Sequence, residues 1–186
     1  LHTELSSEQK AKRLGGSIFK LANRIAVLTP KMVWDAILTG KPYPVKAVHL
    51  HGSNPVITRA NASEVYQALS QVDFLVVSDF FLTPTAELAD IVLPAATWLE
   101  MEDIGDYWKR QSYIYPRKKI VQIGECRSDH EILMELGKRL GQEQYWHETV
   151  EGDLDYILEP SGLTWEEFRQ LDYLKAEMEY RKYERN

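Results

Sequence analysis

The chain has 186 residues, of which 44% are hydrophobic, and a net charge of −6 at pH 7; this length suffices for one sizeable core with helical extensions. The acidic balance, with a pI near 5.4, argues against a nucleic-acid partner held by bulk charge. No run of 18 apolar residues is present, so we expect no membrane span and a soluble chain.

The first 44 residues are expected to be helical and to belong to a larger domain. A helical pattern begins at Ser7 and continues to Ile25. A second helix is predicted for residues 30–38, because a proline stands at its first position and Gly40 follows its end.

Residues 45–79 are typical of a strand, a helix and a second strand. Residues 45–51 and 74–79 are short, branched and largely apolar, as in buried parallel strands. Residues 60–71 between them have helical spacing, with Asn61 or Ser63 as the N-cap and Glu64 facing back. A right-handed crossover through this helix places the carboxyl ends of the two strands side by side.

Polar residues follow both strands and form a candidate ligand site, because ligands of open α/β sheets bind at such strand ends. In residues 52–55, Gly52 permits close approach to a phosphate or ribose, and a serine and an asparagine offer hydrogen bonds; the alternative is an ordinary turn. Asp79 can accept two N–H groups from a purine or cap the next segment. Thr83 and Thr85 either contact a ligand or close a local turn.

The next segment is expected to hold a short helix at residues 85–89 and a short third strand at 91–93. Residues 95–115 show no clean period, so we predict a long loop with one strand near 112–115. Its acidic residues have no nucleophile or metal beside them and are expected to be solvated.

Three helices are predicted in the remainder, at residues 128–140, 149–158 and 164–185. The first has the strongest support, because Ser128 and Glu131 can form a capping box.

The fold class predicted is α/β, with a three-layer, mainly parallel Rossmann-like sheet flanked by helices and a helical C-terminal extension. The expected domains are a helical lead-in over 1–44, an α/β domain over 45–141, which carries the candidate ligand site, and a helical extension over 142–186.

Residues typical of catalysis or of metal binding are not found. The sequence has no Gly-x-Ser-x-Gly elbow, P-loop or dinucleotide glycine motif. Cys126 has no second cysteine to pair with. His49 and His51 share one strand face, but two histidines without a third ligand do not predict a metal site. We therefore expect a binding domain without a reaction centre.

Four blocks, in chain order, resemble the molybdopterin oxidoreductases of the dimethyl sulfoxide reductase family: residues 52–55, 76–86, 89–95 and 124–132. The resemblance extends from about Ala36 to Leu163. It implies an internal α/β domain that holds the guanosine-phosphate end of one of two molybdopterin guanine dinucleotides.

Taken position by position, the resemblance implies one set of cofactor-binding residues. Residues 52–55 match a loop that lies against the phosphate and ribose, and Asp79 matches a carboxylate that accepts hydrogen bonds from guanine. Phe80 and Thr83 belong to the loop that follows. The implied cofactor-binding residues are therefore Gly52, Ser53, Asn54, Pro55, Asp79, Phe80 and Thr83. Guanine presents N1–H and N2–H₂ side by side, so one carboxylate can bind both. Thr85 and Asp90 match positions with a structural role.

Two departures from the family pattern matter. In many relatives the glutamate that corresponds to Glu100 is followed by Gly-Thr, an Asn and an Arg. In this chain it is followed by Met-Glu-Asp-Ile-Gly-Asp at residues 101–106. This variant sequence resembles the sulfur-oxyanion reductase branch of the family more closely. The family's cysteine cluster for iron–sulfur, its molybdenum-ligating residue and its cofactor-covering domain have no counterpart here. Cys126 stands where relatives often carry alanine.

The resemblance implies a fragment of an enzyme that moves electrons between a substrate and iron–sulfur carriers. Its expected partners are the other domains of the parent chain and an iron–sulfur electron-transfer subunit. The N-terminus has neither an initiator Met nor a signal pattern, so we expect a cut within a longer chain, cytoplasmic or exported according to the parent's own N-terminus. The fragment alone is expected to be inactive, without bound cofactor. Alternatives are a stand-alone guanine-nucleotide-binding or regulatory module, and a structural α/β domain that has lost its ligand.

Overall fold

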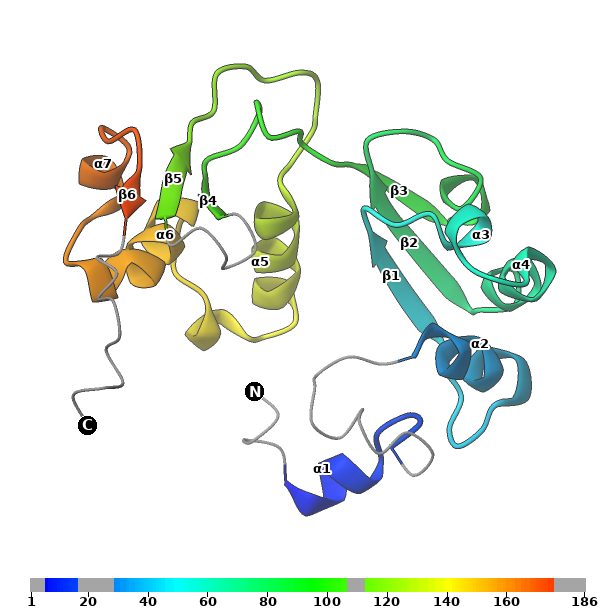
Figure 1. Ribbon diagram of the computed structural model, residues 1–186. Coiled ribbons are helices and arrows are strands. Elements are labelled where there is room, and N and C mark those ends of the chain that lie inside the picture. The colour runs from blue at the N-terminus through cyan, green and yellow to red at the C-terminus, as the bar shows by residue number, and fades with distance from the viewer. Residues whose placement is uncertain (1–5, 17–28, 107–112, 176–186) are drawn as a thin grey trace, which may run out of the picture. The chain divides into compact units, whose positions relative to one another are not determined.

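The computed structural model describes residues 6–16, 29–106 and 113–175, which form two compact units, residues 1–93 and 94–186 (Figure 1). The division between the units falls within the expected domain 45–141. No helix among the described residues is both long and apolar enough to cross a membrane.

The first unit has an α/β architecture. Its elements, in chain order, are α1 (Ser7–Ala11), α2 (Pro30–Thr39), β1 (Ala47–His51), α3 (Pro55–Thr58), α4 (Ala62–Leu69), β2 (Phe74–Asp79), the 3-10 turn η2 (Ala86–Leu88) and β3 (Ile91–Pro94). The helix predicted from Ser7 is described only as α1, and its continuation beyond Gly16 lies outside the described residues. The helix α3 was not predicted, because four residues show no period.

The sheet of this unit has the strand order β1-β2-β3. Strands β1 and β2 are parallel, with Ala47 paired with Phe74 and His51 with Ser78. The α/β prediction and the parallel pairing through a crossover helix are therefore confirmed.

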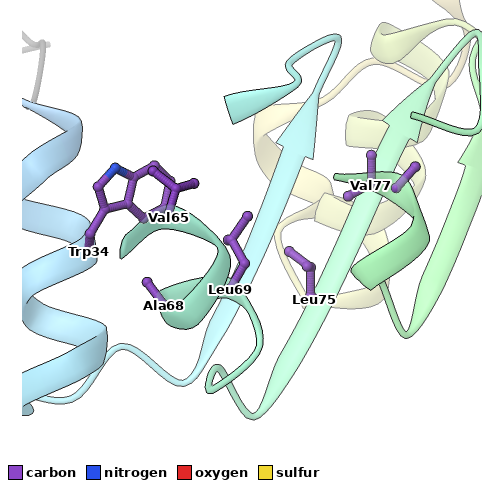
Figure 2. Packing of buried hydrophobic residues seen from close by; sticks show 7 residues of the cluster. Trp34, Val65, Ala68, Leu69, Leu75 and Val77 are labelled. Carbon is purple, nitrogen blue, oxygen red and sulfur yellow. The ribbon is translucent and has the colours of Figure 1, made fainter. Parts of the chain in front are cut away.

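One face of the sheet carries the core of the unit (Figure 2). Leu75 and Val77 of β2 form one buried cluster with Trp34 of α2 and with three residues of α4, Val65, Ala68 and Leu69. Trp34 lies beside Val65 in this cluster (Figure 2). Val48 and Leu50 of β1 pack against the same cluster. Because side chains alternate along a strand, His49, His51 and Ser78 lie on the opposite face.

The N-terminus of α4 differs in detail from the predicted capping box. Asn61 is the N-cap, but its backbone is left-handed (φ 58°) and its side chain caps no N–H group. Its Nδ2 donates instead to Oε2 of Glu64, at 3.4 Å.

The second unit contains an antiparallel sheet that the sequence analysis did not predict. Its elements are β4 (Asp103–Asp106), β5 (Tyr113–Arg117), α5 (Asp129–Arg139), η3 (Glu143–Tyr145), α6 (Val150–Leu158), η4 (Glu159–Ser161), α7 (Trp165–Phe168) and β6 (Leu174–Lys175). The strand order is β4-β5-β6, and both pairings are antiparallel. The predicted capping box of Ser128 and Glu131 is confirmed at the start of α5.

Two predictions in this unit are wrong. Residues 95–115 were expected to be a loop with one strand, but β4 lies within them. The helix expected over 164–185 ends at Phe168, and Leu174 pairs with Ile114 in β6 and packs against the second core of Leu154, Leu158, Trp165 and Phe168. Strand pairing to a distant partner therefore overrides the local helical pattern; residues 176–185 lie outside the described part.

Asp153 of α6 joins three parts of the second unit. Its Oδ2 contacts Nε2 of His130 at the start of α5, at 2.5 Å. Its Oδ1 contacts Nδ1 of His147 at 2.6 Å and accepts from the backbone N–H of that residue at 3.2 Å. Burial would raise the pKa of Asp153, but the hydrogen bonds from His147 and His130 outweigh burial and hold that pKa below its ordinary value.

We predict that Leu69→Ala lowers the free energy of unfolding of the first unit by about 2–5 kcal/mol, because Leu69 is 2% exposed in the core. Hydrogen exchange of the β2 amides measures this opening. The matched control on the same helix is Tyr66→Ala, since Tyr66 is 53% exposed; its effect should stay below about 1 kcal/mol. Equal effects of the two substitutions would contradict the assignment of the core.

We predict that Asp153→Asn removes about 1–3 kcal/mol of stability at pH 7, because two imidazoles lose an anionic partner. A carboxylate with a lowered pKa stabilises the fold above its unfolded pKa of about 3.9, and this contribution is lost as pH falls through the folded value. Urea midpoints at about pH 7 and about pH 3 should therefore differ less in the variant than in the parent sequence. Asp172→Asn, at an exposed position of the same unit, is the control, and an unchanged pH dependence in Asp153→Asn would refute the role of Asp153.

Candidate functional site

The carboxyl ends of β1 and β2 meet at one edge of the sheet. The N–H of Gly52, directly after β1, donates to the carbonyl of Ser78 at 2.8 Å. Asp79, the last residue of β2, follows Ser78. The glycine turn and the carboxylate are thus neighbours, as the crossover connection predicts.

Gly52 adopts a left-handed backbone conformation, with φ +50°, that favours glycine. No heavy atom lies within 4 Å of the position that a Cβ would occupy. The residue is exposed. The turn therefore leaves its backbone accessible to a ligand at the strand end.

The next residues of this loop are fixed from inside. Thr85 is fully buried; its Oγ1 donates to Oδ1 of Asn54 at 2.7 Å and accepts from the N–H of Val56 at 3.2 Å. Pro55 is buried and is the first residue of α3. Thr85 thus has the structural role expected for it, and Asn54 uses its side-chain oxygen within the protein.

Asp79 keeps one oxygen for another partner. Its Oδ1 accepts from the N–H of Phe80 at 2.7 Å. Its Oδ2 accepts no hydrogen bond from any residue that the structure describes, and the side chain is half-buried. Asp79 does not cap the 83–89 turn; Thr83 closes that turn, accepting from the N–H of Ala86 at 3.2 Å.

Three exposed apolar residues follow Asp79 in the chain. Phe80, Phe81 and Leu82 are 59%, 76% and 67% exposed. Phe80 stays a candidate contact for a ligand, while the hydroxyl of Thr83 is already used as an acceptor. Ser53 is half-buried, and its side chain has no hydrogen-bond partner in the described part of the chain.

Asp90 holds the opposite end of β2. Its Oδ2 accepts from the N–H of Leu75 at 2.7 Å, and its own N–H donates to the carbonyl of Leu75 at 2.9 Å. This paired contact supports the structural role that the motif implied for Asp90. It lies at the far end of the strand from Asp79.

A histidine pair beside the site was not included among the candidate residues. Nε2 of His49 contacts Oγ of the fully buried Ser78 at 2.9 Å, and Nε2 of His51 contacts Nδ1 of His49 at 3.2 Å. The available signal was their shared strand face. Among the described residues, no group of three His, Cys, Asp or Glu side chains is arranged to hold a metal ion.

One residue of the acidic segment after β3, Glu100, is hydrogen-bonded inside the second unit. Glu100 is buried and accepts from the N–H and Oγ1 of Thr97, at 3.0 and 2.9 Å, and from the N–H of Ile123 at 3.0 Å. The bond from the Thr97 N–H, with that from its hydroxyl, lowers the pKa of Glu100. Glu100 therefore does not fit the expectation of a solvated loop. Glu100, Arg127 and Arg139 are among the residues that line a cavity of about 580 Å³.

Comparison with known proteins identifies related chains. A family model described as molybdopterin oxidoreductase matches residues 9–139. Acetylene hydratase of Syntrophotalea acetylenica is 34% identical over 155 residues, which are 81% of this chain and 21% of that protein. The thiosulfate reductase molybdopterin-containing subunit of Salmonella typhimurium is 35% identical over 145 residues, 76% of this chain and 19% of the subunit.

A solved structure agrees with these matches. Acetylene hydratase from Pelobacter acetylenicus superposes with a TM-score of 0.84 and 27% identity, over 96% of this chain and 28% of that one. The chain spans about a fifth of the length of the curated relatives it matches. With more than half of its residues matched by the family model, the chain belongs to the molybdopterin oxidoreductase family.

Proposed function

We propose that this chain is an internal domain of a molybdenum-dependent oxidoreductase and binds the guanosine-phosphate end of a molybdopterin guanine dinucleotide. The observation that carries the proposal is the position of Gly52 beside Asp79, at the carboxyl ends of two parallel strands. The bound group would supply a metal centre for electron transfer at its other end, away from the Gly52–Asp79 strand end.

The open oxygen of Asp79 supports guanine as the base. Guanine carries two adjacent donors, N1–H and N2–H₂, and a carboxylate can accept from both. Asp79 has Oδ2 without a described partner, and Oδ1 already accepts from Phe80. One free and one shared acceptor fit two donors, whereas adenine offers no such donor pair.

The glycine turn supports a phosphate or ribose beside the base. Its backbone is exposed, and no heavy atom occupies the space next to Gly52. Ser53 has a hydroxyl available for an oxygen atom of the ligand. The bond from Thr85 to Asn54 holds the loop in this conformation before a ligand binds, which reduces the ordering cost of binding.

The parent enzyme and its partners are part of the same proposal. The relatives are several times longer than this chain, so the remaining domains would complete the cofactor site. We infer that the parent moves electrons between a substrate and iron–sulfur carriers, through its own cluster and a separate electron-transfer subunit. An independent guanine-nucleotide-binding module would use the same Asp79 geometry, and the length of the relatives favours the enzyme.

We predict that Asp79→Asn weakens guanosine monophosphate binding by about 1–3 kcal/mol, because the amide replaces an acceptor oxygen with a donor that faces guanine N–H groups. The asparagine oxygen can still accept from Phe80, so the thermal midpoint should hardly change. Ligand-observed NMR titration measures the affinity. Inosine monophosphate lacks the N2 amine and should lose less affinity in the same substitution.

The matched control for this prediction is Thr85→Val. Loss of the buried hydroxyl leaves Asn54 Oδ1 and the Val56 N–H without a partner, so stability should fall by about 1–3 kcal/mol. Affinity should follow stability in Thr85→Val but not in Asp79→Asn. Unchanged guanosine monophosphate affinity in Asp79→Asn would refute the assignment of the base.

We also predict that the purified 186-residue chain binds guanine nucleotides at about the millimolar level and carries no molybdenum. An isolated domain keeps part of the cofactor contacts but still bears the full association cost. Nucleotide titration and elemental analysis measure the two quantities. Stoichiometric molybdenum after purification would contradict the division of the cofactor among several domains.

A further inference from the structure

The histidine pair of β1 lies at the strand end that carries the proposed site. The two rings are 3.8 Å apart between centroids, with an interplanar angle of 43°. Nε2 of His51 contacts Nδ1 of His49 at 3.2 Å, and Nε2 of His49 reaches Oγ of Ser78 at 2.9 Å. A continuous hydrogen-bonded path thus leads from the residue before Gly52 to the residue before Asp79.

The surroundings of this strand end are poor in positive charge. In residues 47–58 and 74–90, the side chains that can become cationic are His49 and His51, and Arg59 follows as the C-cap of α3. The same stretches contribute two carboxylates to this strand end, Asp79 of β2 and Glu87 of η2. Asp90 lies at the other end of β2, and α3 has no titratable side chain. A diphosphate bound here would therefore meet net negative charge unless the histidine pair is protonated.

We propose that the His49–His51 pair binds one proton together with the phosphate groups and so makes nucleotide binding at the Gly52–Asp79 site dependent on pH. This inference rests on the proposed function, because it specifies how that site neutralises its ligand. His49 and His51 act as positioning residues for the anionic part of the nucleotide.

The geometry limits the pair to a single added proton. At 3.2 Å, one facing nitrogen must donate and the other must accept. One added proton makes one ring cationic and keeps this bond. Two would place N–H groups on both facing nitrogens and put like charges in contact.

Proton binding and anion binding are then reciprocal. A phosphate stabilises the cationic pair, and the cationic pair strengthens phosphate binding by the same factor. The coupling acts on the phosphate groups and leaves the base contact with Asp79 unaffected. A nucleoside without phosphate therefore serves as an internal control.

The experiment compares guanosine diphosphate mannose with guanosine on the 186-residue chain. The diphosphate of the first compound is esterified at both ends, so its charge is constant at about pH 6 and about pH 8, both above the pI of 5.4. We expect guanosine diphosphate mannose to bind about tenfold more tightly at about pH 6, and guanosine to bind equally at both values. NMR titration of the histidine rings should show proton uptake when the former binds.

His51→Gln is the test variant, because the glutamine amide reaches the position of Nε2 and can hydrogen-bond to His49 but cannot be protonated. It should bind guanosine diphosphate mannose with the same affinity at both pH values. His147→Gln in the second unit is the control and should keep the pH dependence. The ring titration of the unmodified chain decides the question if His51→Gln fails to fold.

The outcomes separate the two proposals. Binding of both compounds without pH dependence, or a pH dependence that persists in His51→Gln, would overturn the role of the histidine pair and leave the guanine site standing. Failure of both compounds to bind at either pH would overturn the proposed function itself, and this inference with it.

Discussion

The register between β1 and β2 is the constraint on which the rest of the first unit depends. Val48 and Leu50 face the core, and His49 and His51 face away from it. A slip of one residue would exchange these two sets and bury imidazoles among aliphatic side chains. The register that avoids this exchange pairs His51 with Ser78 and so places Gly52 beside Asp79. The geometry of the candidate site is therefore a consequence of hydrophobic packing.

Elements with strong local signals were predictable, and elements made by distant pairing were not. The two apolar strands, the helix between them and the Ser128 capping box can be recognised within about a dozen residues. The strand β4 and the two-residue β6 have no period of their own, and their existence depends on β5. The helical pattern after Trp165 yields to this pairing because Leu174 gains a place in the second core.

The candidate site shows the same division. Residue type made Gly52 and Asp79 candidates beside the alternatives of an ordinary turn and a cap, and the family resemblance assigned both to the cofactor. The sequence could not distinguish a ligand contact from an internal bond at Asn54, since its partner Thr85 is 31 residues away. His49 and Ser78 are separated by 29 residues. Hydrogen bonds across such separations depend on atomic geometry, which composition and spacing do not encode.

The polar groups at this edge of the sheet are of two kinds: those that hydrogen-bond within the protein and those that remain available to a ligand. The side-chain oxygens of Asn54, Thr83 and Thr85 form hydrogen bonds within the protein, and these bonds hold the loops in one conformation. Asp79 keeps an acceptor outside that network, in a chain whose charge is already −6. Such an acceptor selects a ligand by its donors, yet it repels any phosphate on the same ligand. Base recognition and phosphate binding therefore make opposite electrostatic demands on one strand end, and separate groups must meet them.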